Sequence, residues 1–101
     1  MPERCFNRLT AAGPADLVER FVADPSWEPS LAARFSEFLD HWEGRYVRMF
    51  ETDGPPLDGL KALSIQWPGL TLILDYGFEE SAIKGLAMVR DGKLQHCQFT
   101  Y

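Results

Sequence analysis

Five carboxylates fall at or near the ends of expected strands, and they are the first candidates for catalytic or metal-binding residues in this chain. They are Glu51, Asp53, Asp75, Glu79 and Glu80. A pair of carboxylates can act as general acid and base, and a group of them can hold a divalent cation. Acidic residues are also common in turns, where they solubilise the chain and form local hydrogen bonds, and this structural interpretation is favoured. Asp75 stands out because it lies inside an otherwise apolar strand.

Histidine and cysteine supply the other reactive groups, and the chain has two of each. His96 and Cys97 are adjacent, so in a strand they point to opposite sides and do not form a base and a nucleophile. Cys5 can meet His96 or Cys97 only if the first and last strands lie side by side. Neither cysteine has the spacing of a metal ligand. The first residues show no export signal, so we expect both thiols to be reduced in the cytoplasm.

Recognised catalytic and cofactor motifs are absent from the sequence. It has no phosphate-binding glycine loop, no serine-hydrolase elbow, no HExxH pattern and no EF-hand loop, so it assigns no catalytic residue, cofactor or metal. The 15 acidic and 10 basic side chains give a net charge of −5 with no basic cluster, so nucleic-acid binding is not expected. No apolar run is long enough to cross a bilayer, and no membrane contact is expected.

The elements that would position these groups follow from hydrophobic periodicity and turn residues. Alternation predicts strands over residues 4–11, 45–52, 70–76, 82–90 and 93–101. Helical spacing predicts helices over residues 15–23 and 57–66, and a further helix from about Ser30 to Trp42. That further helix is inferred from an apolar stripe interpreted as core, made of Leu31, Phe35, Phe38, Leu39 and Trp42. Asp91-Gly92 is a strong hairpin signal.

These elements predict a single α+β domain over residues 1–101 with the order β-α-α-β-α-β-β-β. The two strand–helix–strand connections favour right-handed crossovers. We therefore expect a two-layer sandwich, in which a mixed, mostly antiparallel sheet of about five strands carries helices on one face. Gly85 lies inside a strand, which indicates a bulge or the close approach of another backbone.

Several short patterns are similar to those of one known family. They are Cys5-x-Asn7-x-Leu9 followed by Gly13-Pro14, then Trp42-Glu43-Gly44-Arg45-Tyr46, then Phe50-x-Thr52 with Pro55-Pro56, and finally Trp67-Pro68-x-Leu70 with Leu72, Tyr76 and Gly85. Over most of its length the chain thereby resembles the YubB-like family of plasmid- and phage-borne proteins. The resemblance implies a ferredoxin-like domain of mobile-element origin, and it brings no catalytic residues with it.

The sequence favours a binding surface over a catalytic or metal site. Its candidate residues are Asn7, Trp27, Trp42, Arg45, Tyr46 and Asp75. A structural role is favoured for those that match the family patterns: Asn7 would tie a strand to a turn, and Arg45 would stack over a ring. Trp27 lies in a Pro-flanked loop, so it is a candidate for exposure at an interface, although capping of the core is the favoured interpretation.

Taken together, these features favour a small cytoplasmic protein-interaction or binding module that is not an enzyme. The alternative is a small hydrolase or metal-dependent enzyme that uses the strand-end carboxylates. Two or more of those carboxylates converging with a histidine in one pocket would favour the enzyme. The expected partner is another protein, and a homodimer is expected through the C-terminal edge strand or the Trp27 loop.

Overall fold

Six strands and three helices make up the part of the chain that the computed structural model describes, residues 4–24 and 26–101. Residues 1–3, in the stretch where we expected no export signal, and Pro25, in the Pro-flanked loop, lie outside it. In chain order the elements are β1 (Cys5–Ala12), α1 (Ala15–Ala23), α2 (Trp27–Ser30), β2 (Arg34–Trp42), β3 (Arg45–Thr52), α3 (Leu57–Gln66), β4 (Thr71–Phe78), β5 (Ile83–Arg90) and β6 (Lys93–Thr100). No helix of these ranges is both long and apolar enough to span a bilayer.

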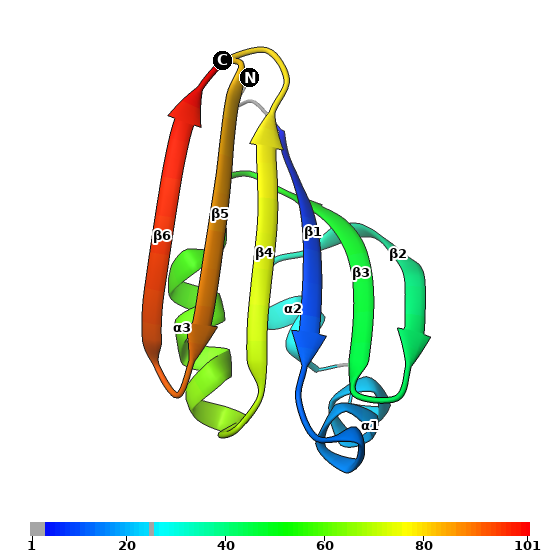
Figure 1. The fold of residues 1–101 in the computed structure, drawn as a ribbon. Helices are drawn as coiled ribbons and strands as arrows, with labels where there is room; N and C mark the ends of the chain where they lie inside the picture. The colour runs from blue at the N-terminus through cyan, green and yellow to red at the C-terminus, as the bar shows by residue number, and fades with distance from the viewer. Residues whose placement is uncertain (1–3, 25) are drawn as a thin grey trace.

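All the strands form one sheet in the order β2-β3-β1-β4-β5-β6, and every neighbouring pair is antiparallel (Figure 1). The expectation of a mixed, ferredoxin-like sheet of about five strands was therefore wrong, as was the predicted element order. The physical reason lies in the position of β1. It is inserted between β3 and β4, so the two strands that α3 connects are not neighbours, and each pairs with β1 in the antiparallel sense.

The largest correction concerns residues 34–42, which form the edge strand β2 instead of a helix. Only Leu31 of the predicted stripe is buried, whereas Phe35, Phe38, Leu39 and Trp42 are exposed. Trp42 pairs with Arg45, so Glu43 and Gly44 make a tight hairpin turn in which Gly44 has a φ of +75°. Aromatic residues favour strands, and the hairpin then joins β2 to β3 directly. Two irregularities interrupt the β2–β3 register.

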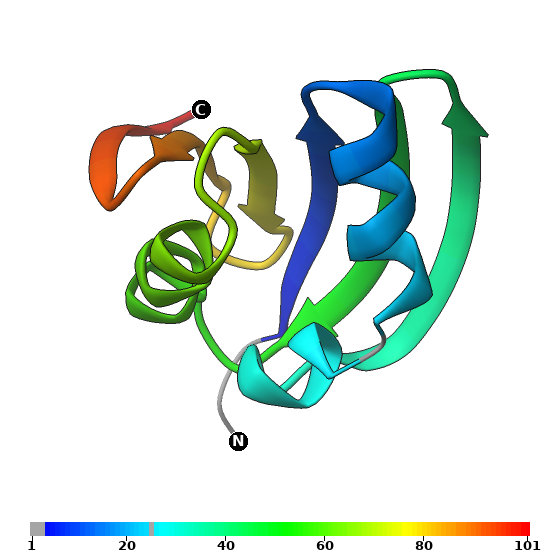
Figure 2. The same cartoon turned by 90° about the horizontal axis from the view of Figure 1, so that it is seen from below.

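One face of the sheet carries the hydrophobic core. Leu9, Leu72 and Leu74 point from the central strands toward the helices and are fully or almost fully buried. Phe21 of α1 stacks on Trp27 of α2 with their ring centroids 5.1 Å apart. All three helices lie on this same side, and the sheet twists strongly around them (Figure 2).

Tyr76 crosses the neighbouring strand at Gly85, its register partner in β5. A Cβ atom added at Gly85 would lie 2.0 Å from Cζ of Tyr76, so only glycine leaves room for the ring. The hydroxyl of Tyr76 continues to β6, where it donates a hydrogen bond to Oε1 of Gln98 (2.7 Å) and contacts Nε2 of His96. The close approach indicated by Gly85 is therefore made by a side chain, and it ties three strands together.

Gly85→Ala is expected to destabilise the fold strongly, because the new methyl group and the Tyr76 ring cannot occupy the same space. We expect a loss of about 3 kcal/mol or more in the free energy of unfolding, measured by urea denaturation. Gly54→Ala is the matched control, since its added Cβ meets no atom within 4 Å. In a Tyr76→Ala background, Gly85→Ala should cost less than about 1 kcal/mol. An equal cost in both backgrounds would contradict the assigned contact.

Candidate functional site

The face of the sheet opposite the helices is uncovered and forms the candidate site. Its side chains alternate with those of the core, and the register places them on neighbouring strands. We call this surface the open face and define it by Phe6, Arg8, Met49, Glu51, Ile73, Asp75, Lys84, Leu86, Met88, Cys97 and Phe99. In Figure 1 the strands lie in front of α2 and α3, so over β4, β5 and β6 the reader looks onto the open face.

Large apolar side chains are concentrated on the β5–β6 half of the open face. Leu86 is 53% exposed and Phe99 54% exposed, and Met88 lies beside them with substantial exposure. A shallow depression of ≈ 450 Å³ runs among Ile73, Leu86 and Met88. Soluble monomers rarely leave contiguous apolar surface in water, so such a patch is typical of a protein-binding surface.

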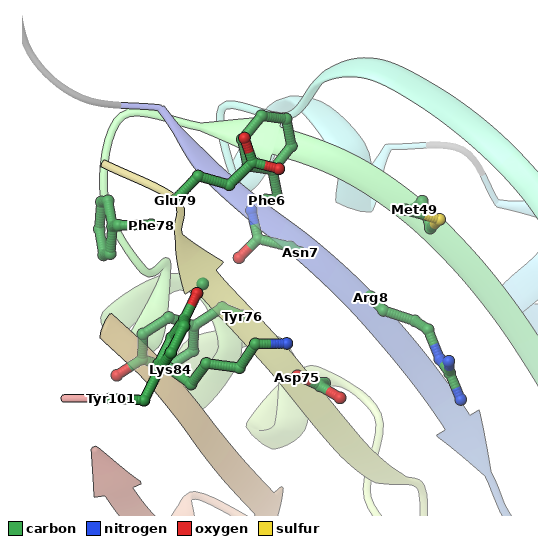
Figure 3. A pocket seen from close by; sticks show the side chains of 11 residues that line it. Phe6, Asn7, Arg8, Met49, Asp75, Tyr76, Phe78, Glu79, Lys84 and Tyr101 are labelled. Atoms are coloured by element: carbon green, nitrogen blue, oxygen red, sulfur yellow. The ribbon is translucent and has the colours of Figure 1, made fainter. Parts of the chain in front are cut away.

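A second, smaller cavity of ≈ 190 Å³ lies at the end of the open face near Phe78, and its lining is polar as well as apolar (Figure 3). Asp75 and Glu79 both contribute carboxylates to it, and Lys84 extends toward Asp75. Phe6 and Tyr101 supply aromatic rings. Because both signs of charge meet here beside aromatic rings, the cavity suits a protein surface of mixed polarity.

The strand-end carboxylates do not gather into one reactive centre. Glu51 pairs with Arg4 at 3.2 Å, and Asp53 pairs with Arg34 at 2.7 Å. Asp75 and Glu79 share the small cavity, but no histidine lines it. Within residues 4–24 and 26–101 no three His, Cys, Asp or Glu side chains are grouped so that they could hold a metal ion.

Asn7 is buried and joins a hydrogen-bonded network on the helix side of the sheet. Its Nδ2 donates to the carbonyl of Cys5 (3.2 Å) and to Oγ1 of Thr52 (2.9 Å). Thr52 in turn donates to the carbonyl of Gly54, where the chain leaves β3. The structure thus places Asn7 where it ties a strand to a turn, and the residue also lines the small cavity together with Asp75 (Figure 3).

Trp42, Arg45 and Tyr46 meet at the β2–β3 hairpin. The guanidinium of Arg45 lies 4.5 Å from the centroid of a Trp42 ring, which confirms the predicted stacking of Arg45 over a ring. Tyr46 is buried and faces the helices, and Nη1 of Arg48 donates a hydrogen bond to its hydroxyl (2.7 Å). Trp42 is about half exposed, so of the three only Trp42 and Arg45 are available to a partner.

Trp27 does not lie in an exposed loop. It begins helix α2 and is only 3% exposed, because Phe21 stacks on it and Phe50 meets it edge to face. The Trp27 side chain is therefore covered within the folded chain, and its capping of the core is confirmed. Of the six predicted surface residues, Asp75 lies within the open face as defined, and the register places Arg45 and Trp42 at the end of the same face beside Ala12.

Two polar networks were missed in the sequence analysis. Arg48 of β3 pairs with Glu28 of α2 at 2.7 Å and contacts Ser36 of β2, which holds the edge strand and the short helix together. The contacts of the Tyr76 hydroxyl with β6 form the other network. Burial raises the pKa of that hydroxyl. Gly85 was the one sequence signal for this second network, while nothing in the spacing of Glu28 and Arg48 indicates the first.

The two cysteines occupy different environments and are both free thiols. Strands β4 and β5 separate β1 from β6, so Cys5 cannot meet either Cys97 or His96. Cys5 is completely buried, and burial raises its pKa from 9.0 to about 11 despite a hydrogen bond with Thr52 that lowers it. Cys97 lies exposed on the open face.

Comparisons with protein families, with curated proteins and with solved structures find no match to this chain. The argument for its function therefore comes from its own residues, above all from those of the open face.

The two thiols should differ in reactivity toward an aromatic disulfide reagent at pH 8. Cys97 is exposed and should react rapidly, whereas Cys5 is buried and largely protonated and should react only as fast as the protein unfolds. The release of chromophore should therefore show one fast thiol per chain. Cys97→Ser should remove the fast phase, and two fast thiols in the wild-type protein would contradict the burial of Cys5.

Stability should decline above pH 9 through Cys5. Below pH 9 the Cys5 thiol is protonated in the folded and in the unfolded state, so its contribution to the free energy of unfolding is fully present. Between pH 9.0 and about 11 the thiol ionises in the unfolded chain before it does in the folded one, and this contribution is lost. The wild-type protein should lose about 1.4 kcal/mol more than Cys5→Ala between pH 8 and pH 10, measured by urea unfolding. Parallel pH profiles for the two proteins would contradict the raised pKa.

Proposed function

We propose that this chain is a cytoplasmic protein-interaction module, without catalysis of its own, that binds a protein partner on its open face. The single observation that carries the proposal is the cluster of large apolar side chains left uncovered on the face of the sheet that does not hold the core. Exposed apolar clusters of this kind are typical of protein-binding surfaces.

The charges around the apolar cluster favour a protein partner. Arg8 and Lys84 lie on the same face as Glu51 and Asp75, so positive and negative groups alternate between neighbouring strands. A nucleic acid or an anionic lipid surface would require one sign of charge. A protein surface can match both signs, and a polar rim around an apolar centre is the usual anatomy of a protein interface.

The positions of the carboxylates support binding over hydrolysis. Glu51 and Asp53 are each paired with an arginine, and the cavity shared by Asp75 and Glu79 has no histidine in its lining. A hydrolase of the expected kind would need one of these carboxylates as a base beside a nucleophile or bound water, and the arginine pairs of Glu51 and Asp53 hold those two in other contacts.

The cellular setting is part of the same proposal. Two free thiols, one of them exposed, suit the reducing cytoplasm, where disulfides are rare. We also propose a mobile-element origin, which rests on the resemblance of the short sequence patterns to those of plasmid- and phage-borne proteins, and the genes beside the one encoding this chain would test it.

Leu86→Arg tests the open face directly, because it places a charge at the centre of the apolar cluster. We expect the tagged wild-type protein to retain a specific protein, a second copy of itself included, from its host's extract, and Leu86→Arg to reduce retention at least about tenfold. Ile65→Arg is the matched control, since Ile65 is an exposed aliphatic residue on α3, off the open face.

The control should retain the same protein at the wild-type level. Circular dichroism and thermal unfolding should show that both variants fold, since both substituted side chains are already exposed. Retention that is equal in all three proteins, or no retained protein at all, would overturn the proposed function.

A further inference from the structure

We infer that the open face binds the open face of a second copy of this chain, with a two-fold axis running parallel to the strands between β1 and β4. The inference deepens the proposed function and rests on it, since it names the partner of the same surface. A two-fold dimer uses one patch twice, so the patch must be complementary to itself. The register of the sheet allows that requirement to be checked residue by residue.

The proposed axis places β4 of one copy over β1 of its partner, and β5 over β3. Residues at the same level along the strands then face each other across the interface. Asp75 and Arg8 are register partners, so they share a level. The Asp75 carboxylate therefore faces the arginine at position 8 of the other copy, and the symmetry makes this contact twice.

The same two-fold axis brings a second pair of opposite charges together. Lys84 pairs with Gly77, Gly77 with Phe6, and Phe6 with Glu51, so all four residues share one level. Lys84 in β5 of one copy then faces Glu51 in β3 of the other. Arg8, Asp75 and Lys84 form no ion pair within residues 4–24 and 26–101, so they are free to pair across the interface.

The apolar residues are complementary under the same axis. Leu86 shares a level with Met49, so these two exposed side chains face each other from β5 and β3. Phe6, which is also partly exposed, faces Gly77 of the other copy. The cluster that is uncovered in one copy would be covered by the second.

The charges also select the direction of the axis. A two-fold axis across the strands would bring Lys84 at one end of β5 against Arg90 at its other end, and would leave Asp75 facing the apolar Ile73. With the axis along the strands, the one like-charge match is Arg90 with Arg45, at an end of the face. This one repulsion stands against two opposite-charge pairs, Asp75 with Arg8 and Lys84 with Glu51, each of which the symmetry makes twice.

The size of the open face fits a stable dimer. Eight-residue strands rise about 3.4 Å per residue, and six strands lie about 4.8 Å apart, which gives the face an area of about 700 Å² per copy. Specific interfaces bury about 800 Å² per partner. A single docked helix or peptide would leave much of this surface uncovered.

Charge reversal at two positions tests the proposal. In sedimentation equilibrium we expect the wild-type chain to be a dimer, and Asp75→Arg and Arg8→Asp each to raise the dissociation constant at least about 30-fold, because each sets like charges face to face twice. Mixing the two variants should restore a one-to-one dimer. The carboxylate introduced at position 8 of one chain then faces the guanidinium introduced at position 75 of the other, and the native pair is kept at the second site.

Asp58→Arg is the matched control, because Asp58 is exposed on α3 and makes the same change of charge off the open face. It should dimerise like the wild-type protein. The mixing step separates the interface from effects within one chain, since mixing cannot relieve a repulsion between two residues of the same copy. Thermal unfolding of the single variants should show that each is folded.

A wild-type chain that stays monomeric at 0.5 mM (roughly the upper limit for a weak dimer) would overturn the proposal. So would a dimer that persists in both single variants, because pairing through the exposed edge of β6 does not involve Arg8 or Asp75. If the chain is monomeric and Leu86 is still needed to retain a different protein, this inference fails and the proposed function stands.

Discussion

Three short helices have to shield a six-stranded sheet from water, and they suffice for only one of its faces. The helices have nine, four and ten residues, and all of them lie on the side that holds the core. A helix rises about 1.5 Å per residue, so none is longer than about 15 Å. The opposite face must therefore remain in water or meet another molecule. Its apolar side chains, its alternating charges and its exposed thiol all have to be understood in that setting.

Local patterns predicted most of the elements well and their assembly poorly. Helix α1 and strand β3 begin and end where the periodicity of the sequence placed them, and the Asp91-Gly92 hairpin is confirmed. The order of strands depends on where β1 enters the sheet, which no local pattern indicates. The helix predicted over residues 34–42 was wrong for another reason. Aromatic residues at helical spacing also suit an edge strand, and the Glu43-Gly44 turn decides between helix and strand.

The site was predictable only in part. Asp75 was found because an acid in an apolar strand is unusual, and the stacking of Arg45 followed from neighbouring residue types. The apolar cluster around Leu86 was not found, because alternation shows that a strand has two faces without showing which one the helices cover. For Asn7 a structural role was favoured over a place on a binding surface, and its partner Thr52 lies far along the chain, so no local pattern indicated the hydrogen bond between them.

The crossing of Tyr76 over Gly85 also constrains how this sequence can change over generations. A glycine without a side chain and a tyrosine that occupies the vacated space form one unit, so the two positions cannot drift independently. The order of substitution matters as well: position 76 has to become smaller before position 85 can gain a side chain, since the reverse order passes through a clashing intermediate. Among descendants of this chain, an aromatic residue at the first position should therefore be inherited together with glycine at the second.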